Sequence, residues 1–141
     1  MEGEQLKVLS KTGGNPQEQT LEAFAGEWSN AAHLWWIEAK PGDRLVLAVP
    51  VRQKGAYRLV LQLTKAPDYG IVQLSLDGQK LGEPIDLYHP DVVPSGALAL
   101  GTRDLKAGEH ELTVEIVGAN PKAVKAYMFG LDYLKLEKAR E

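Results

Sequence analysis

The stretch 65–88, KAPDYGIVQLSLDGQKLGEPIDLY, constrains the fold more than any other part of the chain, because it reads as loop, strand, tight turn and loop. Val72, Leu74 and Leu76 alternate with polar residues at the period of two that a half-buried strand requires. The Asp77-Gly78 pair that follows favours a type I′ hairpin turn, in which both central residues have positive φ. This segment therefore predicts antiparallel β structure.

The same alternation recurs along the chain between turns rich in Gly, Pro and Asp. Strands are predicted over 4–9, 34–37, 44–51, 56–64, 110–117 and 127–136, with a short apolar run at 97–100. The segment 12–19 reads as a loop and 20–24 as a helical turn. The long connections 82–94 and 118–127 suit crossings between two sheets. The predicted fold class is all-β, an antiparallel β-sandwich of jelly-roll type.

Length and charge restrict the organisation and the partners. A chain of 141 residues has the size of one ordinary domain, so a single domain over 1–141 is expected. A formal net charge of −3 without basic clusters argues against nucleic acid and acidic membranes as partners. With no cysteine there is no disulfide framework and no thiolate metal site. No apolar run forms a signal peptide or reaches the length of a membrane span.

Catalytic signatures are weak throughout the sequence. His33, His89 and His110 are far apart with no short metal-ligand spacing, and no nucleophile motif is present. Asp68 and Asp86 flank the central hairpin and could in principle form the carboxylate pair of a glycosidase. Such aspartates more often bond to nearby backbone amides in loops. We therefore expect a noncatalytic protein.

Aromatic residues in or beside predicted loops are the most suggestive feature. Sugars present flat C–H faces and rims of hydroxyls, which suit an aromatic plane next to a few polar groups. Trp35 and Trp36 must point to opposite faces of one strand, and Glu38 on the face of Trp36 favours Trp36 as the outer ring. The alternative is that these rings close the ends of the hydrophobic core. The predicted ligand-binding set is Trp28, Trp36, Asp68, Tyr69, Tyr88 and Asn120.

Several segments, in order, resemble carbohydrate-binding modules of the family 6 and family 35 type, which have a galactose-binding-like jelly roll. The opening Glu2-Gly3-Glu4 is similar to the Glu-x-Glu start of these modules, and GLDYLKL at 130–136 to their closing strand. Turn motifs at 41–43, 55–57, 76–78 and 107–110 fall between them in the expected order. KAPDYGIVQLSLDG, IDLY and GLDYL more closely resemble the accessory β-sandwich of fructofuranosidase-related glycoside-hydrolase-like proteins.

The resemblance carries functional expectations. It implies a noncatalytic module that binds a polysaccharide or oligosaccharide on loops at one end of the sandwich. It also implies a place beside the catalytic domain of a larger secreted or periplasmic glycan-degrading enzyme. Such modules often hold a structural calcium ion, a role that would fall to Glu2, Glu4 and Asp132. The alternative is a structural or protein-interaction domain whose exposed aromatic residues form a contact patch.

Overall fold

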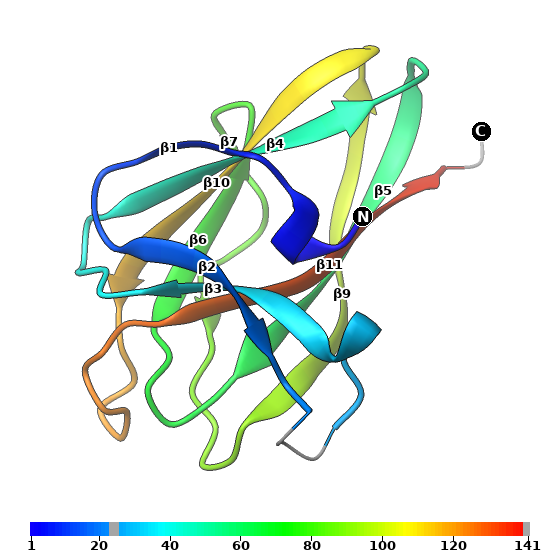
Figure 1. The fold of residues 1–141 in the computed structure, drawn as a ribbon. Coiled ribbons are helices and arrows are strands. Elements are labelled where there is room, and N and C mark those ends of the chain that lie inside the picture. The colour runs from blue at the N-terminus through cyan, green and yellow to red at the C-terminus, as the bar shows by residue number, and fades with distance from the viewer. Residues whose placement is uncertain (23–25, 140–141) are drawn as a thin grey trace.

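The computed structural model describes residues 1–22 and 26–139, and its strands form two antiparallel sheets packed face to face (Figure 1). Sheet A contains, in spatial order, β2 (Asn15–Thr20), β3 (Ala32–Ile37), β11 (Phe129–Lys138), β5 (Gly55–Lys65) and β9 (Val93–Leu105). Sheet B contains β1 (Val8–Lys11), β4 (Arg44–Val51), β10 (Gly108–Gly118), β6 (Ile71–Leu76) and β7 (Gln79–Lys80), and β8 (Ile85–Asp86) also pairs with β6. Two short 3-10 turns, η1 (Gly3–Gln5) and η2 (Ser29–Ala31), complete the described structure.

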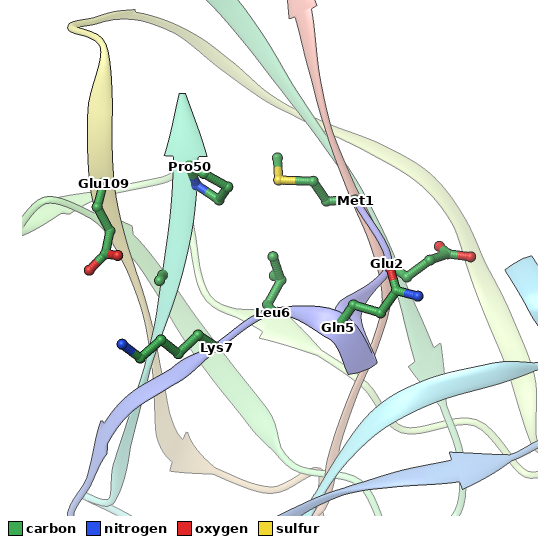
Figure 2. Close-up of a pocket in the computed structure, with 8 residues that line it drawn as sticks. Met1, Glu2, Gln5, Leu6, Lys7, Pro50 and Glu109 are labelled. Carbon is green, nitrogen blue, oxygen red and sulfur yellow. The ribbon is translucent and has the colours of Figure 1, made fainter. Parts of the chain in front are cut away.

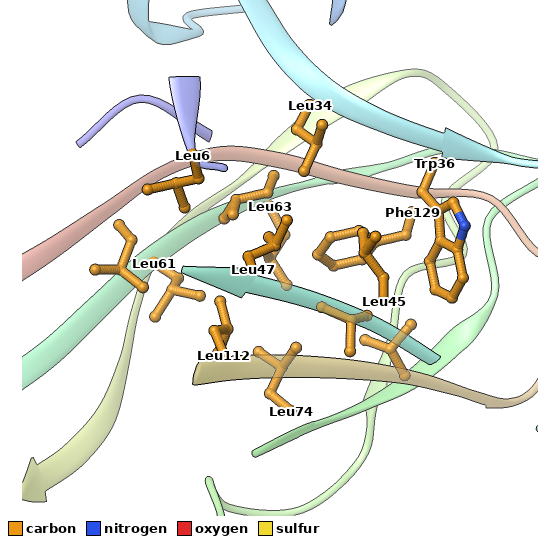
Figure 3. Packing of buried hydrophobic residues seen from close by; sticks show 14 of the residues in the cluster. Leu6, Leu34, Trp36, Leu45, Leu47, Leu61, Leu63, Leu74, Leu112 and Phe129 are labelled. Atoms are coloured by element: carbon orange, nitrogen blue, oxygen red, sulfur yellow. The ribbon is translucent and has the colours of Figure 1, made fainter. Parts of the chain in front are cut away.

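The core lies between the two sheets and is built from the alternating apolar faces that the sequence predicts (Figure 3). Sheet B contributes Leu45, Leu47, Leu74 and Leu112, which meet Leu34, Trp36, Leu61, Leu63 and Phe129 of sheet A. Outward residues of β10, such as Glu111, remain exposed. The two-sheet sandwich is therefore confirmed, because one buried face from each sheet forms a common core.

The central hairpin is also confirmed. Asp77 and Gly78 have φ values of 50° and 82°, as a type I′ turn requires. β4 spans Arg44–Val51, the predicted bounds, and the short apolar run at 97–100 lies inside the longer β9.

Two predictions near the N-terminus are wrong. The segment 4–9 contains part of the turn η1, and the first strand begins only at Val8. The predicted loop 12–19 instead contains β2, which pairs with β3 along its whole length. β2 is a polar strand at the edge of sheet A, and its sequence lacks the apolar alternation of an inner strand. An edge strand also tolerates Pro16, which has no N–H to donate to a neighbouring strand. The predicted helical turn over 20–24 extends into residues outside the described part.

The outer face of sheet A is covered by chain rather than open to solvent. The turn η1 packs on β3 and β11, and the segment 26–31 lies over β5 and β11. As a result the outward-facing Thr64 is fully buried and Gln62 is 9% exposed. Within the described residues, no helix has the length and apolar character needed to cross a membrane.

Candidate functional site at the loop end

Several connections meet at one end of the sandwich, which we call the loop end: segments 38–43, 66–70, 87–92 and 119–128 (Figure 1). Backbone hydrogen bonds join the last three of these segments, from Met128 N–H to Asp68 O at 3.1 Å and from Val124 N–H to Pro67 O at 2.9 Å. Leu87 N–H donates to Gly70 O at 3.1 Å. These three loops therefore form one connected surface.

Four of the predicted ligand-binding residues lie in this loop end, namely Asp68, Tyr69, Tyr88 and Asn120. Asp86 ties the last two together, because it accepts hydrogen bonds from Asn120 Nδ2 at 2.7 Å and from Tyr88 N–H at 2.9 Å. This is the loop-capping role expected for such an aspartate. Tyr69 is 3% exposed, and burial, with the nearby Asp68 charge, raises the pKa of its hydroxyl. Tyr69 is therefore a neutral wall of the site.

Two predicted aromatic positions turn out to be buried. The expectation that Trp36 is the outer ring of its pair is wrong, because Trp36 is fully buried and its indole N–H donates to Gly13 O at 3.0 Å. Trp28 is 8% exposed, and its indole N–H donates to Thr64 Oγ1 at 2.9 Å. β3 ends at Ile37, and Glu38 has a positive φ of 63°. Because strand alternation stops before Glu38, its side chain carried no information about the face of Trp36.

Trp35, the ring expected to face the core, is the member of the pair that reaches the loop end. It is half-buried on the outer face of sheet A and borders a hollow of about 90 Å³. The strand alternation identified this position as one of two choices, so the signal was present in the sequence. The other main lining residues are Gln19, Asp68, Tyr69, Val92 and Met128.

A wider groove of about 770 Å³ adjoins this hollow, since Met128 lines both. Its walls include the half-buried Tyr127 and the exposed cations Lys40 and Lys125. Tyr127 has a positive φ of 53°, an uncommon conformation for a side chain of this size. The loop end thus offers a continuous concave surface with aromatic and charged groups.

A chain of hydrogen bonds crosses the outer face of sheet A and ends at the hollow. Thr64 Oγ1 accepts from Trp28 and lies 2.7 Å from His33 Nδ1, while His33 Nε2 lies 2.6 Å from Gln19 Oε1. Because an amide oxygen only accepts, Nε2 carries the proton of His33, and Thr64 donates to Nδ1. Burial lowers the pKa of His33 to about 4, so the imidazole is neutral at pH 7.

Glycine at position 130 makes this crossing possible. Gly130 lies on β11 between His33 of β3 and Thr64 of β5. A Cβ at this position would overlap the His33 ring and approach Thr64 Cβ to 3.0 Å. The missing side chain lets the imidazole lie flat across the strand.

Two of the predicted calcium ligands, Glu2 and Asp132, meet through Ser29 at the other edge of this covered face. Asp132 accepts from Ser29 N–H at 3.0 and 2.9 Å and from Gln62 Nε2 at 2.7 Å, and Ser29 Oγ donates to Glu2. One oxygen of Glu4 is buried with no hydrogen-bond partner among the described residues.

Burial raises the pKa of Glu4, and the carboxylates of Glu2, Glu18 and Asp132 raise it further. Burial likewise raises the pKa of Asp132, with a smaller contribution from Glu2. Within residues 1–22 and 26–139, however, no three His, Cys, Asp or Glu side chains are arranged to hold a metal ion. The three carboxylates interact electrostatically, but Glu2 and Asp132 already accept hydrogen bonds from Ser29.

A separate hollow of about 310 Å³ lies beside the N-terminus (Figure 2). Met1, Leu6 and Pro50 form its apolar part, with Lys7 and Glu109 at its rim. None of the described residues that line it is aromatic. It therefore lacks the flat face that favours a sugar ring, and the loop end is the better candidate.

No family model matches the sequence, and no curated protein matches it. Solved structures do share the fold. A xanthan lyase from Paenibacillus aligns with a TM-score of 0.84 and 22% identity, over 98% of this chain and 13% of the lyase. A family 35 carbohydrate binding module from Clostridium thermocellum aligns with a TM-score of 0.58 and 18% identity, over 97% of this chain and 96% of the module.

The C-terminal CBM6 of a marine laminarinase from Zobellia galactanivorans aligns with a TM-score of 0.53 and 13% identity, over 98% of this chain and 97% of that module. The chain therefore spans a small part of the xanthan lyase but nearly the whole of each separate module. These matches confirm the predicted antiparallel β-sandwich: the chain shares this fold with carbohydrate-binding modules of families 6 and 35.

Proposed function

We propose that this protein is a noncatalytic carbohydrate-binding module whose binding surface is the loop end. The observation that carries the proposal is the alignment of nearly the whole chain with nearly the whole of two modules named for carbohydrate binding. The noncatalytic assignment is supported by Asp86, one of the two aspartates that could form a glycosidase pair, because its carboxylate caps a loop by accepting from Tyr88 N–H and Asn120 Nδ2.

The chemistry of the loop end agrees with this function. Trp35, Tyr88 and Tyr127 are half-buried there, so part of each aromatic side chain is accessible. Asp68 and Asn120 add hydrogen-bonding groups in the same loops. The wider groove has a volume of about 770 Å³, within the range typical of small-ligand sites.

We extend the proposal to the parent protein. The chain aligns with 13% of a xanthan lyase, which supports a role as an accessory or targeting domain joined to a catalytic domain. A polysaccharide substrate implies a secreted or periplasmic location for that larger protein. A module of this kind would keep the enzyme close to its polymer by raising the effective substrate concentration.

A polysaccharide and glycan binding screen on the purified chain tests the proposal directly. We expect specific binding to at least one glycan, and Tyr88→Ala and Asp68→Ala should weaken it by about tenfold or more. Tyr133→Ala is the matched control, because Tyr133 lies along β11 with Lys135 Nζ 4.9 Å from its ring centroid. Absence of binding across the panel, together with a concentration-dependent dimer in light scattering, would favour the protein-interaction alternative.

We also propose that calcium binds at Glu2, Glu4 and Asp132 and stabilises the covered face of sheet A. The unpartnered oxygen of Glu4 supports this, because Ca²⁺ prefers hard carboxylate oxygens and would supply the missing partner. Because Ser29 occupies oxygens of Glu2 and Asp132, binding would require these hydrogen bonds to rearrange.

Thermal unfolding with calcium and with chelator tests the calcium proposal. Calcium needs ionised carboxylates, and the pKa values of Glu4 and Asp132 are raised, so the increase in Tm should be larger at pH 7 than at pH 5. Glu4→Gln should remove the increase, whereas Glu18→Gln, on the exposed side of β2, should keep most of it. Equal Tm values with calcium and chelator at pH 7 would exclude the site.

A further inference from the structure

The hollow beside Trp35 has a distinctive set of polar groups. In the described part of the chain the Asp68 carboxylate has no ion pair and no side-chain hydrogen bond, so it can accept from a ligand. Gln19 and Trp35 line the same hollow and bring N–H donors. Tyr69 and Met128 supply apolar walls. Directional polar groups on an apolar wall are typical of a selective ligand site.

The orientation of the Gln19 amide follows from the hydrogen-bond chain across sheet A. Its oxygen accepts the Nε2 proton of His33 at 2.6 Å, and His33 is itself held by Thr64 at 2.7 Å. With the amide oxygen turned toward His33, the amide NH2 group points away from the imidazole. Among the described residues these hydrogens have no side-chain acceptor, so they are available at the hollow.

The indole N–H of Trp35 is the second donor. It is buried with no hydrogen-bond partner among the described residues, whereas those of Trp28 and Trp36 donate to Thr64 and to Gly13. A buried donor without an acceptor is unfavourable, and an oxygen atom from a ligand would relieve that cost. The unbranched Met128 side chain borders the hollow and can change rotamer to admit such an atom.

The volume limits what can enter. The hollow measures about 90 Å³, well below the roughly 300 Å³ at which sites for whole small ligands begin. A sugar ring cannot fit inside, but one edge with two adjacent hydroxyls can. The Asp68 carboxylate in the wall would repel a second carboxylate, which disfavours an acidic sugar.

We propose that this hollow is a subsite for the edge of a neutral sugar residue with two adjacent free hydroxyls, as at the end of a glycan chain. One hydroxyl oxygen accepts from Gln19 and Trp35, and the neighbouring hydroxyl donates to Asp68. His33 is a positioning residue, because it fixes the Gln19 amide without touching the ligand. This inference rests on the proposed function and adds the chemical class that the loop end selects.

Nuclear magnetic resonance on the ¹⁵N-labelled chain tests the subsite. The chain has 3 tryptophans, and the signal that is lost in Trp35→Phe identifies the Trp35 indole among the three. The probes are methyl β-D-galactopyranoside, methyl β-D-mannopyranoside and methyl β-D-glucopyranoside, with methyl β-D-glucopyranosiduronic acid as the acidic comparison. We expect a neutral glycoside to shift the Trp35 indole and Gln19 side-chain signals more than those of Trp28 and Trp36, and the acidic one to shift them less.

The outcomes separate this inference from the proposed function. If a glycan shifts backbone signals of the loop end but leaves the Trp35 indole and the Gln19 amide in place, the subsite is wrong and the module still binds sugar. If the polysaccharide screen finds a ligand but none of the three neutral glycosides shifts the Trp35 indole, the chain-end subsite is also wrong. If the screen and the titrations both find nothing, the proposed function fails and this inference fails with it.

Matched variants add a quantitative test. Gln19→Glu keeps an oxygen acceptor for His33 but removes both amide donors, so binding of the responsive glycoside should weaken by roughly tenfold. Trp35→Phe keeps a ring but removes the N–H, and should weaken binding by roughly 3- to 10-fold. Gln17→Glu is the control, because Gln17 is an exposed residue of the same strand and does not line the hollow. Equal losses for Gln17→Glu and Gln19→Glu would overturn the assignment.

The positioning role of His33 has its own readout. In His33→Leu the Gln19 amide is free to rotate, so its side-chain signal should lose its response to the glycoside while the Trp35 indole keeps its own. An unchanged Gln19 response in a folded His33→Leu protein would contradict the positioning role. If His33→Leu does not fold, His33→Met, which also lacks a donor for the Gln19 oxygen, gives the same comparison.

Discussion

The two outer faces of the sandwich carry polar residues at the same alternation, yet one is buried and the other is not. Among the described residues, the buried polar or charged side chains of sheet A are His33, Gln62, Thr64 and Asp132, whereas sheet B has Gln73. On sheet B, Glu111 is exposed, and Arg44 and Glu115 form a surface ion pair at 3.2 Å. Strand alternation alone therefore does not distinguish a solvent-facing polar row from a covered one.

The difference arises from segments that have no strand pattern of their own. The turn η1 and the segment 26–31 lie over sheet A, and they bring Trp28 and Ser29 onto its polar residues. Buried polar groups are costly unless they are paired, and on sheet A they are linked to one another and to these segments. The covered face thereby forms a network that reaches the loop end at Gln19.

The strongest test of this comparison is Trp28→Ala, which removes the ring that covers Thr64. Because Trp28 is 8% exposed and hydrogen-bonded, its loss should lower the free energy of unfolding by about 3–5 kcal/mol, measured by urea denaturation. Replacing an exposed binding residue would have a different effect, because it would weaken sugar binding and leave stability unchanged.

Glu111→Ala is the matched change on the open face of sheet B. The Glu111 side chain is exposed, so the free energy of unfolding should change by no more than about 0.5 kcal/mol. Similar losses in Trp28→Ala and Glu111→Ala would mean that the two outer faces are equally exposed in solution.

A second test uses the pH dependence of stability. The folded-state pKa of His33 is about 4, below its ordinary 6.5, so its contribution is fully present above pH 6.5 and is lost as pH falls through 4. This loss should approach about 3 kcal/mol. Glu4 and Asp132 have raised pKa values and act in the opposite direction, so the difference between the wild type and His33→Gln is the quantity to measure. A pH-independent difference would contradict a buried, neutral His33.

Gly130 and Gly118 offer a matched pair of smaller changes on the two sheets. Gly130→Ala should cost about 1–3 kcal/mol, because the new Cβ would overlap His33. Gly118→Ala on β10 meets open space, so stability should change by less than about 0.5 kcal/mol. Chemical denaturation of both variants gives the comparison, and a neutral Gly130→Ala would mean that His33 does not lie across β11.

The sequence predicted the core of the fold because inward residues are apolar and periodic. β4, β6 and β10 each present this pattern, and the Asp77-Gly78 turn fixes one register between neighbours. The edge strand β2 was missed because its few inward contacts need no apolar alternation. Periodicity reports burial of one face, and it is silent where an edge is polar or where another segment covers the second face.

The candidate site was predicted less completely, for a related reason. The loop residues Asp68, Tyr69, Tyr88 and Asn120 do lie at one end of the sandwich, as their place in predicted loops suggested. The choice between Trp35 and Trp36 depended on where β3 ends, and the positive φ of Glu38 is a backbone property that no residue pattern nearby indicated. The sequence did not indicate Gln19 as a site residue, because its orientation depends on a tertiary contact with His33.

The smallest expected effect concerns His110 on sheet B, whose contribution to stability depends on pH with the opposite sign to that of His33. Its Nδ1 lies 2.5 Å from Asp77 Oδ2 and its Nε2 lies 2.7 Å from Lys106 O. Both nitrogens face acceptors, so the protonated ring can donate from both, which favours the imidazolium over the neutral form. The hydrogen bond to Asp77, with that to Lys106, raises the pKa of His110.

The stability from His110 is therefore fully present below pH 6.5 and is lost as pH rises through the raised folded-state pKa. Asp77 is 45% exposed, so solvent screening should limit the effect to about 1 kcal/mol or less. Urea denaturation between pH 6 and 9 should give a slope that His110→Gln removes and His89→Gln retains. Because His33 loses its contribution on acidification and His110 on alkalinisation, a shared sign for the two would show that burial does not distinguish the faces.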